Sequence, residues 1–183
     1  QPLALSVADS QGATASQEML VTVQNAFEGR VIDGPLSGSE VFLDLNGNGI
    51  LDEGEPSGLS DIEGYFQLPL LADNVARDLA DNLSAQLVSL GGIDSLTNVE
   101  LSNLTLTADL PADPSGLIAI TPISSVLTTV DTDEAKAEIL SALGISGTVD
   151  EFLAKDLWAM AQADEANSRA LQNINQQIGL LFS

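Results

Sequence analysis

The spacing of the apolar residues changes at Pro122, and this change limits the fold class. Before it, several segments place an apolar side chain at every second position, as in Asn103–Ala108, where Leu104, Leu106 and Ala108 share one face. After it, apolar residues recur at helical spacing while Gly and Pro become scarce. The sequence therefore predicts an α+β fold in which a β-sandwich precedes a helical subdomain.

The predicted strands are short runs in which apolar residues alternate or cluster between turn residues. The pattern of residues 71–83 is ambiguous, and Asp73–Leu83 could form a short helix before the strand that ends at Gly91 and Gly92. The strands are expected at Leu3–Val7, Met19–Val23, Phe27–Ile32, Glu40–Asp44, Gly64–Leu68, Ser84–Leu90, Asn103–Ala108 and Leu117–Thr121.

Capping residues mark the ends of the predicted helices. Asp131 with Glu134, and Thr148 with Glu151, have the spacing of capping boxes, which supply acceptors to the free amides of a first turn. Gly144 is expected to end the helix that begins near Asp133.

Two apolar stripes in this region should pack on each other and on the sandwich, because short helices are marginal alone. The first stripe comprises Val149, Phe152 or Leu153, and Met160, and the second comprises Leu171, Ile174, Ile178 and Leu181.

The amino-acid composition limits the classes of partner that the chain can bind. The chain has 27 acidic and five basic residues, with a formal net charge of -22, so it should repel nucleic acids and anionic membranes. No stretch approaches the roughly 18 apolar residues of a membrane span, and residues 1–9 show no targeting pattern, so no membrane insertion is expected. The absence of Cys and His excludes disulfides and disfavours zinc, which leaves cations that prefer oxygen ligands.

The residues Asp44–Glu55 match a twelve-position calcium loop of the EF-hand type. A glycine, Gly49, stands at position six, where the loop must turn sharply. The candidate metal ligands are Asp44, Asn46, Asn48, Ile50 through its carbonyl, Asp52 and Glu55.

The alternative is an Asn-Gly-rich surface turn that binds nothing. Against it, seven acidic residues lie from Glu40 to Glu63, and no Lys or Arg occurs from Val31 to Ala76, so these charges would repel one another without a cation. Magnesium fits less well than calcium, because its small octahedral shell retains water.

The predicted flanks of this loop are strands, whereas an ordinary EF-hand has helices. The run "SGSEVFLDLNGNGILDEGEPSGLSDIEGYFQL" resembles the calcium-binding B-type domain of serine-aspartate repeat surface proteins, and related transthyretin-like or carboxypeptidase-regulatory-like modules of large bacterial adhesins. The resemblance covers residues 29–68. It implies an Ig-like or transthyretin-like β-sandwich in which calcium stiffens a stalk or joint, with the six loop residues as ligands and Asp61 as a further acidic neighbour.

The two ends of the chain resemble other modules. Residues 1–25 resemble the last strands of a cadherin-like or immunoglobulin-like repeat, and "IAITPISSVLTTV" with "EAKAEILSALGI" resembles a helical extension of large bacterial surface proteins. The predicted division is therefore a repeat end at 1–25, a calcium-binding sandwich at 26–121 and a helical subdomain at 122–183.

Three functions are compatible with these patterns. The first is a non-catalytic, extracellular structural or adhesive module, which holds neighbouring modules of the same chain at the bacterial cell surface or in a secreted protein. The second is recognition of a surface glycan or protein ligand, for which Tyr65 and Trp158 are the large amphipathic aromatics. The third is a glycoside hydrolase that uses paired carboxylates, although no pair stands apart in the sequence. No catalytic residue and no organic cofactor is predicted.

Overall fold

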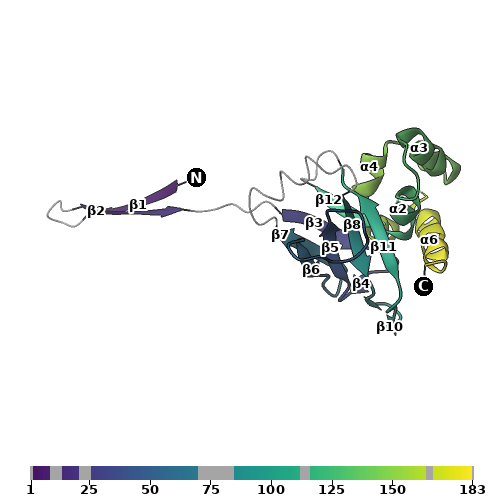
Figure 1. The fold of residues 1–183 in the computed structure, drawn as a ribbon, viewed down its shortest axis with the longest axis horizontal. Coiled ribbons are helices and arrows are strands. Elements are labelled where there is room, and N and C mark those ends of the chain that lie inside the picture. The colour runs from purple at the N-terminus through teal and green to yellow at the C-terminus, as the bar shows by residue number, and fades with distance from the viewer. Residues whose placement is uncertain are drawn as a thin grey trace.

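Figure 1 shows the computed structural model, which describes residues 2–8, 14–20, 26–69, 85–111, 116–163 and 167–182. Strands dominate the first two thirds and helices follow Pro122, which confirms the α+β prediction. The possible helix at 73–83 lies outside the described residues.

Two sheets form the larger part of the β region. The first has the antiparallel order β11 (Thr105–Asp109), β8 (Gln86–Leu90), β5 (Glu40–Asp44) and β6 (Ser57–Leu59). In the second, β3 (Ala26–Val31) lies between β12 (Leu117–Ile120), which is parallel to it, and β7 (Tyr65–Pro69), which is antiparallel.

Two smaller sheets complete the described strands. One joins β4 (Leu36–Ser37), β9 (Ile93–Asp94) and β10 (Val99–Glu100), and the sequence patterns had not predicted it. The other is a hairpin of β1 (Pro2–Ala8) and β2 (Thr14–Leu20). Strand β2 starts at Thr14, earlier than the predicted strand Met19–Val23. Met19 and Leu20 belong to it, and residues 21–25 lie outside the described part.

One hydrophobic cluster joins both large sheets and the helices. Burial of each such side chain stabilises the fold by about 1.5–3 kcal/mol, so the cluster accounts for much of the driving force. Its members include Phe27, Val31, Val41, Leu43, Phe66, Leu68, Leu87, Leu106, Ile118 and Ile120 from strands, and Ile123, Leu127, Leu140, Phe152, Leu153 and Leu157 from helices.

In the part of the chain that the structure describes, five helices follow β12 and lie beside the sheets (Figure 1). Of the predicted stripe in the earlier helices, Phe152 and Leu153 are buried, whereas Val149 and Met160 are half-buried. The helices are α2 (Pro122–Leu127), α3 (Asp133–Ala142), α4 (Val149–Leu153), α5 (Leu157–Gln162) and α6 (Ser168–Gly179).

The helix ends follow the capping prediction in part. Thr148 and Glu151 form the predicted capping box of α4. The cap of α3 is Thr132 rather than Asp131, because the Thr132 hydroxyl accepts the Ala135 N–H at 3.2 Å. Gly144 follows the end of α3 with a φ of +74°, the left-handed conformation that stops a helix.

Helix α6 fully buries a mostly polar stripe that lies beside the predicted apolar one. Leu171 and Ile178 of the predicted stripe are half-buried and pack against the hydrophobic cluster, whereas Leu181 is 82% exposed, so it does not belong to the packed face. Fully buried Asn175 explains why this face of α6 is turned inward. Its Nδ2 donates to the Ile32 carbonyl at 3.0 Å, and its Oδ1 accepts the Ile123 N–H at 3.2 Å. The residues buried on α6 are Ser168, Gln172, Asn175 and Gly179.

Arg30 joins the second sheet to α5. The side chain is 5% exposed, so its charge needs partners. Its Nε donates to the Glu63 carbonyl at 2.7 Å, and a terminal nitrogen lies 2.8 Å from the carboxylate of Asp156, which also caps α5. The guanidinium lies 4.5 Å from the centre of the Tyr65 ring.

The carboxylate of Asp33 packs against α6, but its hydrogen bonding is less complete than that of the Arg30 guanidinium. Its Oδ1 is buried, with no hydrogen-bond partner among the described residues, and a Cβ added at Gly179 would lie 2.3 Å from it. Burial, followed by the nearby charge of Asp94, raises the pKa of Asp33 to about 6.

Because its pKa is raised in the folded state, Asp33 should lower the free energy of unfolding as the pH rises. Its protonated form contributes stability that is fully present below about pH 4, the unfolded pKa, and is lost as the pH passes through about 6. We expect Asp33→Asn to be more stable than the parent at pH 7 and to lose this part of the pH dependence, measured by urea unfolding in EDTA from pH 4 to 7. The exposed Asp131→Asn variant is the control for net charge, and equal pH profiles for both variants would contradict the assignment.

Candidate functional site

The candidate metal loop begins where β5 ends. Asp44 is the last residue of β5 and is fully buried, whereas Asn46, Asn48 and Asp52 are exposed and Glu55 is half-buried. The chain leaves the loop into β6, which pairs antiparallel with β5, and the Leu43 N–H donates to the Pro56 carbonyl at 2.9 Å. Strands thus flank the loop on both sides. The sequence predicted the strand before the loop, but it had placed the following strand at Gly64–Leu68 and had not predicted β6.

The carboxylate of Asp44 organises the first half of the loop. Its Oδ1 accepts the backbone N–H groups of Gly47 at 2.7 Å and Asn48 at 3.2 Å, and its Oδ2 accepts that of Gly49 at 2.7 Å. Gly47 and Gly49 have φ values of +73° and +74°, which L side chains rarely adopt. The two glycines therefore let the backbone wrap around one carboxylate.

Three side chains converge over the loop. The amide nitrogens of Asn46 and Asn48 both donate to Oδ2 of Asp52, each at 2.8 Å. The oxygen of Asn46 accepts the Asn48 N–H at 3.0 Å, and that of Asn48 accepts the Ile50 N–H at 2.7 Å. These short local bonds fix the two Asn side chains on the side of Asp52.

Glu55 closes the loop. Its Oε1 accepts the Leu45 N–H at 2.7 Å and its Oε2 accepts the Asp52 N–H at 2.9 Å. One carboxylate thereby joins the second position of the loop to the ninth, so the last residue reaches back to the first turn.

Five of the six predicted ligand residues share this hydrogen-bonded network through their side chains: Asp44, Asn46, Asn48, Asp52 and Glu55. The sixth, Ile50, joins it through its N–H, and its side chain is 63% exposed. Asp61 has a different role, because its Oδ1 accepts the N–H groups of Glu63 and Tyr65 in the turn before β7.

Gln86 is a neighbour of the site that the sequence analysis missed. It lies opposite Asp44 in the β5–β8 register, and its Nε2 lies 3.4 Å from Oδ2 of Asp44. No local pattern points to Gln86, because the contact depends on strand pairing across 42 residues.

The donor set is chemically suited to a hard divalent cation. Carboxylate and amide oxygens are the ligands that calcium prefers, and the loop holds both kinds. Within the described ranges, no three His, Cys, Asp or Glu side chains are grouped as a metal site. Any cation here would therefore need the Asn oxygens and a backbone carbonyl as well as the acids.

The two lysines of the chain and the two large amphipathic aromatics lie away from the loop in sequence. Lys136 pairs with Asp109 at 2.7 Å, and Lys155 lies 3.4 Å from the Ser146 carbonyl. Trp158 is half-buried on α5, and Tyr65 is 38% exposed beside Arg30.

Comparison of the chain with protein-family models, curated proteins and solved structures gives no match. Among the helices in the described residues, none is long and apolar enough to cross a membrane.

The role of Asp44 in the loop can be tested without metal. In Asp44→Ala, the N–H groups of Gly47 and Gly49 lose their acceptor, so we expect the free energy of unfolding in EDTA to fall by about 1–3 kcal/mol. Glu53→Ala is the matched control, since Glu53 is an exposed acid in the same loop. Equal stability of the two variants in urea unfolding would show that the carboxylate does not organise the loop.

Proposed function

We propose that this chain is a non-catalytic, calcium-binding structural or adhesive module of a large extracellular bacterial protein, at the cell surface or secreted. The observation that carries the proposal is one loop between two strands in which the side chains of five residues all take part in the hydrogen bonds that hold it: Asp44, Asn46, Asn48, Asp52 and Glu55. The resemblance of residues 29–68 to calcium-binding modules of surface proteins supports the same function.

The loop geometry leaves acceptor capacity for a cation. An ionised carboxylate has about four lone-pair sites, and Glu55 uses one strong bond on each oxygen. At Asp44, the contacts with Asn48 at 3.2 Å and Gln86 at 3.4 Å are long and weak, so a cation can replace them at little cost. At Asp52, a cation would replace the amide N–H donors of Asn46 and Asn48. The two Asn side chains would then rotate so that their oxygens face the cation.

Charge also favours a cation here. Asp44, Asp52 and Glu55 lie within twelve positions, and Arg30, the nearest basic residue in sequence, pairs with Asp156 on the helical side. Bound calcium would offset the repulsion among these carboxylates. The ligand set for calcium is Asp44, Asn46, Asn48, the Ile50 carbonyl, Asp52 and Glu55.

The position of the loop suits a stiffening role. It connects β5, an inner strand of the four-stranded sheet, to the edge strand β6. A cation held by both ends of the loop would restrain β6 and with it one edge of an Ig-like or transthyretin-like sandwich. The partners would then be neighbouring modules of the same protein.

Calcium titration by calorimetry tests this function. We expect one ion per chain, and we expect Glu55→Gln to bind at least about tenfold more weakly, a loss of about 1.4 kcal/mol, because one closing oxygen becomes an amide. Glu53→Gln carries the same charge change and should bind as the parent does. Calcium at a hundredfold excess over Kd should also add about 2.7 kcal/mol to the free energy of unfolding.

Two results would refute the proposal. One is the absence of binding heat at millimolar calcium together with an unchanged melting temperature in EDTA. The other is equal affinity in Glu55→Gln and Glu53→Gln, which would place the ion elsewhere.

A further inference from the structure

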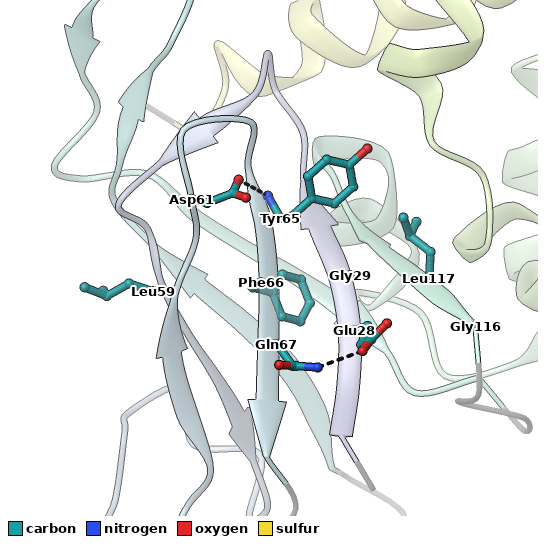
Figure 2. Close-up of a pocket in the computed structure, with 9 residues that line it drawn as sticks. All are labelled: Glu28, Gly29, Leu59, Asp61, Tyr65, Phe66, Gln67, Gly116 and Leu117. Carbon is teal, nitrogen blue, oxygen red and sulfur yellow. Dashed lines mark hydrogen bonds between the residues drawn. The ribbon is translucent and has the colours of Figure 1, made fainter.

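A groove of about 530 Å³ crosses the second sheet, away from the Asp44–Glu55 loop. Figure 2 shows that Tyr65 and Gln67 on β7, Glu28 on β3 and Leu117 on β12 line it. The cross-strand pairs Glu28–Gln67 and Arg30–Tyr65 belong to the face of the sheet that points away from the core. Helix α5 approaches one end of this face, where Asp156 pairs with Arg30.

Tyr65 provides the groove with a held aromatic ring. The Arg30 guanidinium lies over the ring at 4.5 Å from its centre, and Arg30 as a residue is 5% exposed, so one face of the ring packs on a buried side chain. The Tyr65 hydroxyl lies 3.4 Å from the Asp156 carboxylate. With 38% of Tyr65 still exposed, the ring offers surface to a ligand without first having to be ordered.

Glu28 and Gln67 supply polar groups beside this ring. The Gln67 amide donates to Oε1 of Glu28 at 2.7 Å, and this bond orients both side chains (Figure 2). A carboxylate accepts about four hydrogen bonds and an amide oxygen two, so the pair can accept further donors. A ligand that brings several hydroxyl groups meets these acceptors.

The charge of the groove limits the class of ligand. Among the described residues that line it are the acids Glu28 and Asp61 but no Lys or Arg, and the chain carries a net charge of -22, so anions are repelled. A wholly apolar ligand would desolvate the Glu28 carboxylate without replacing its hydrogen bonds.

We propose that this groove binds a neutral saccharide, whose C–H face stacks on Tyr65 while its hydroxyl groups donate to Glu28 and Gln67. The site goes beyond the calcium function, because no described residue of the Asp44–Glu55 loop lines it. The volume of about 530 Å³ is within the range of small-molecule sites.

The test is a calorimetric and ligand-observed NMR screen of the whole chain against neutral oligosaccharides of glucose, galactose, mannose and N-acetylglucosamine. We expect at least one of them to bind at millimolar concentration or below. Glu28→Ala and Tyr65→Ala should weaken that binding at least about tenfold, whereas Glu100→Ala, which removes an exposed acid on β10, should bind as the parent does.

Titrations in EDTA and with charged ligands distinguish saccharide binding in this groove from two alternatives. These are binding at the calcium loop and binding of a charged ligand. Binding should persist in EDTA, so the saccharide site and the calcium site can fail independently. Failure of all neutral sugars to bind, stronger binding of a uronic acid oligomer or a lysine-rich peptide, or equal binding by Glu28→Ala and Glu100→Ala would overturn the proposal. Circular dichroism of Tyr65→Ala checks that its loss of binding does not arise from unfolding, and Glu28→Ala, an exposed side chain, gives the same test independently.

Discussion

The buried carboxylate of Asp44 is the constraint on which the rest of the loop depends. A negative charge without solvent contact must be satisfied by hydrogen bonds or by a cation. The N–H groups of Gly47 and Gly49 meet this need by turning the chain back on itself. That turn brings Asn46, Asn48 and Asp52 together and lets Glu55 close the loop from the other side. The same geometry that satisfies one buried charge therefore holds the residues of the proposed calcium ligand set in one loop.

Polar side chains also attach the helices to the sheets. Arg30 connects β3 with the cap of α5, and Asn175 connects α6 with the end of β3 and the start of α2. Because hydrogen bonds are directional, these two residues fix the orientation of helices that the shared hydrophobic cluster alone would leave less specific. The Arg30 contact has a second effect, since it also supports the ring of Tyr65 on the outer face of the sheet.

Local patterns predicted the features that depend on local chemistry. Glu40–Asp44 is a strand with the predicted bounds, the Thr148 capping box is present, and Gly144 ends α3. The buried face of α6 could not be predicted in this way, because the partners of Asn175 lie 52 and 143 residues away. The contact of Gln86 with Asp44 likewise depends on strand register rather than on sequence spacing. The spacing of the residues was enough to identify the candidate ligands of the loop. Spacing alone does not determine whether the loop binds an ion.

The most direct measurement is a crystal structure of the protein grown with calcium, with anomalous data collected to identify the ion. We expect one calcium peak at about 2.3–2.6 Å from oxygens of Asp44, Asn46, Asn48, Asp52 and Glu55 and the Ile50 carbonyl. A loop that holds only water at saturating calcium, with the amides of Asn46 and Asn48 still bonded to Asp52, would contradict the central claim.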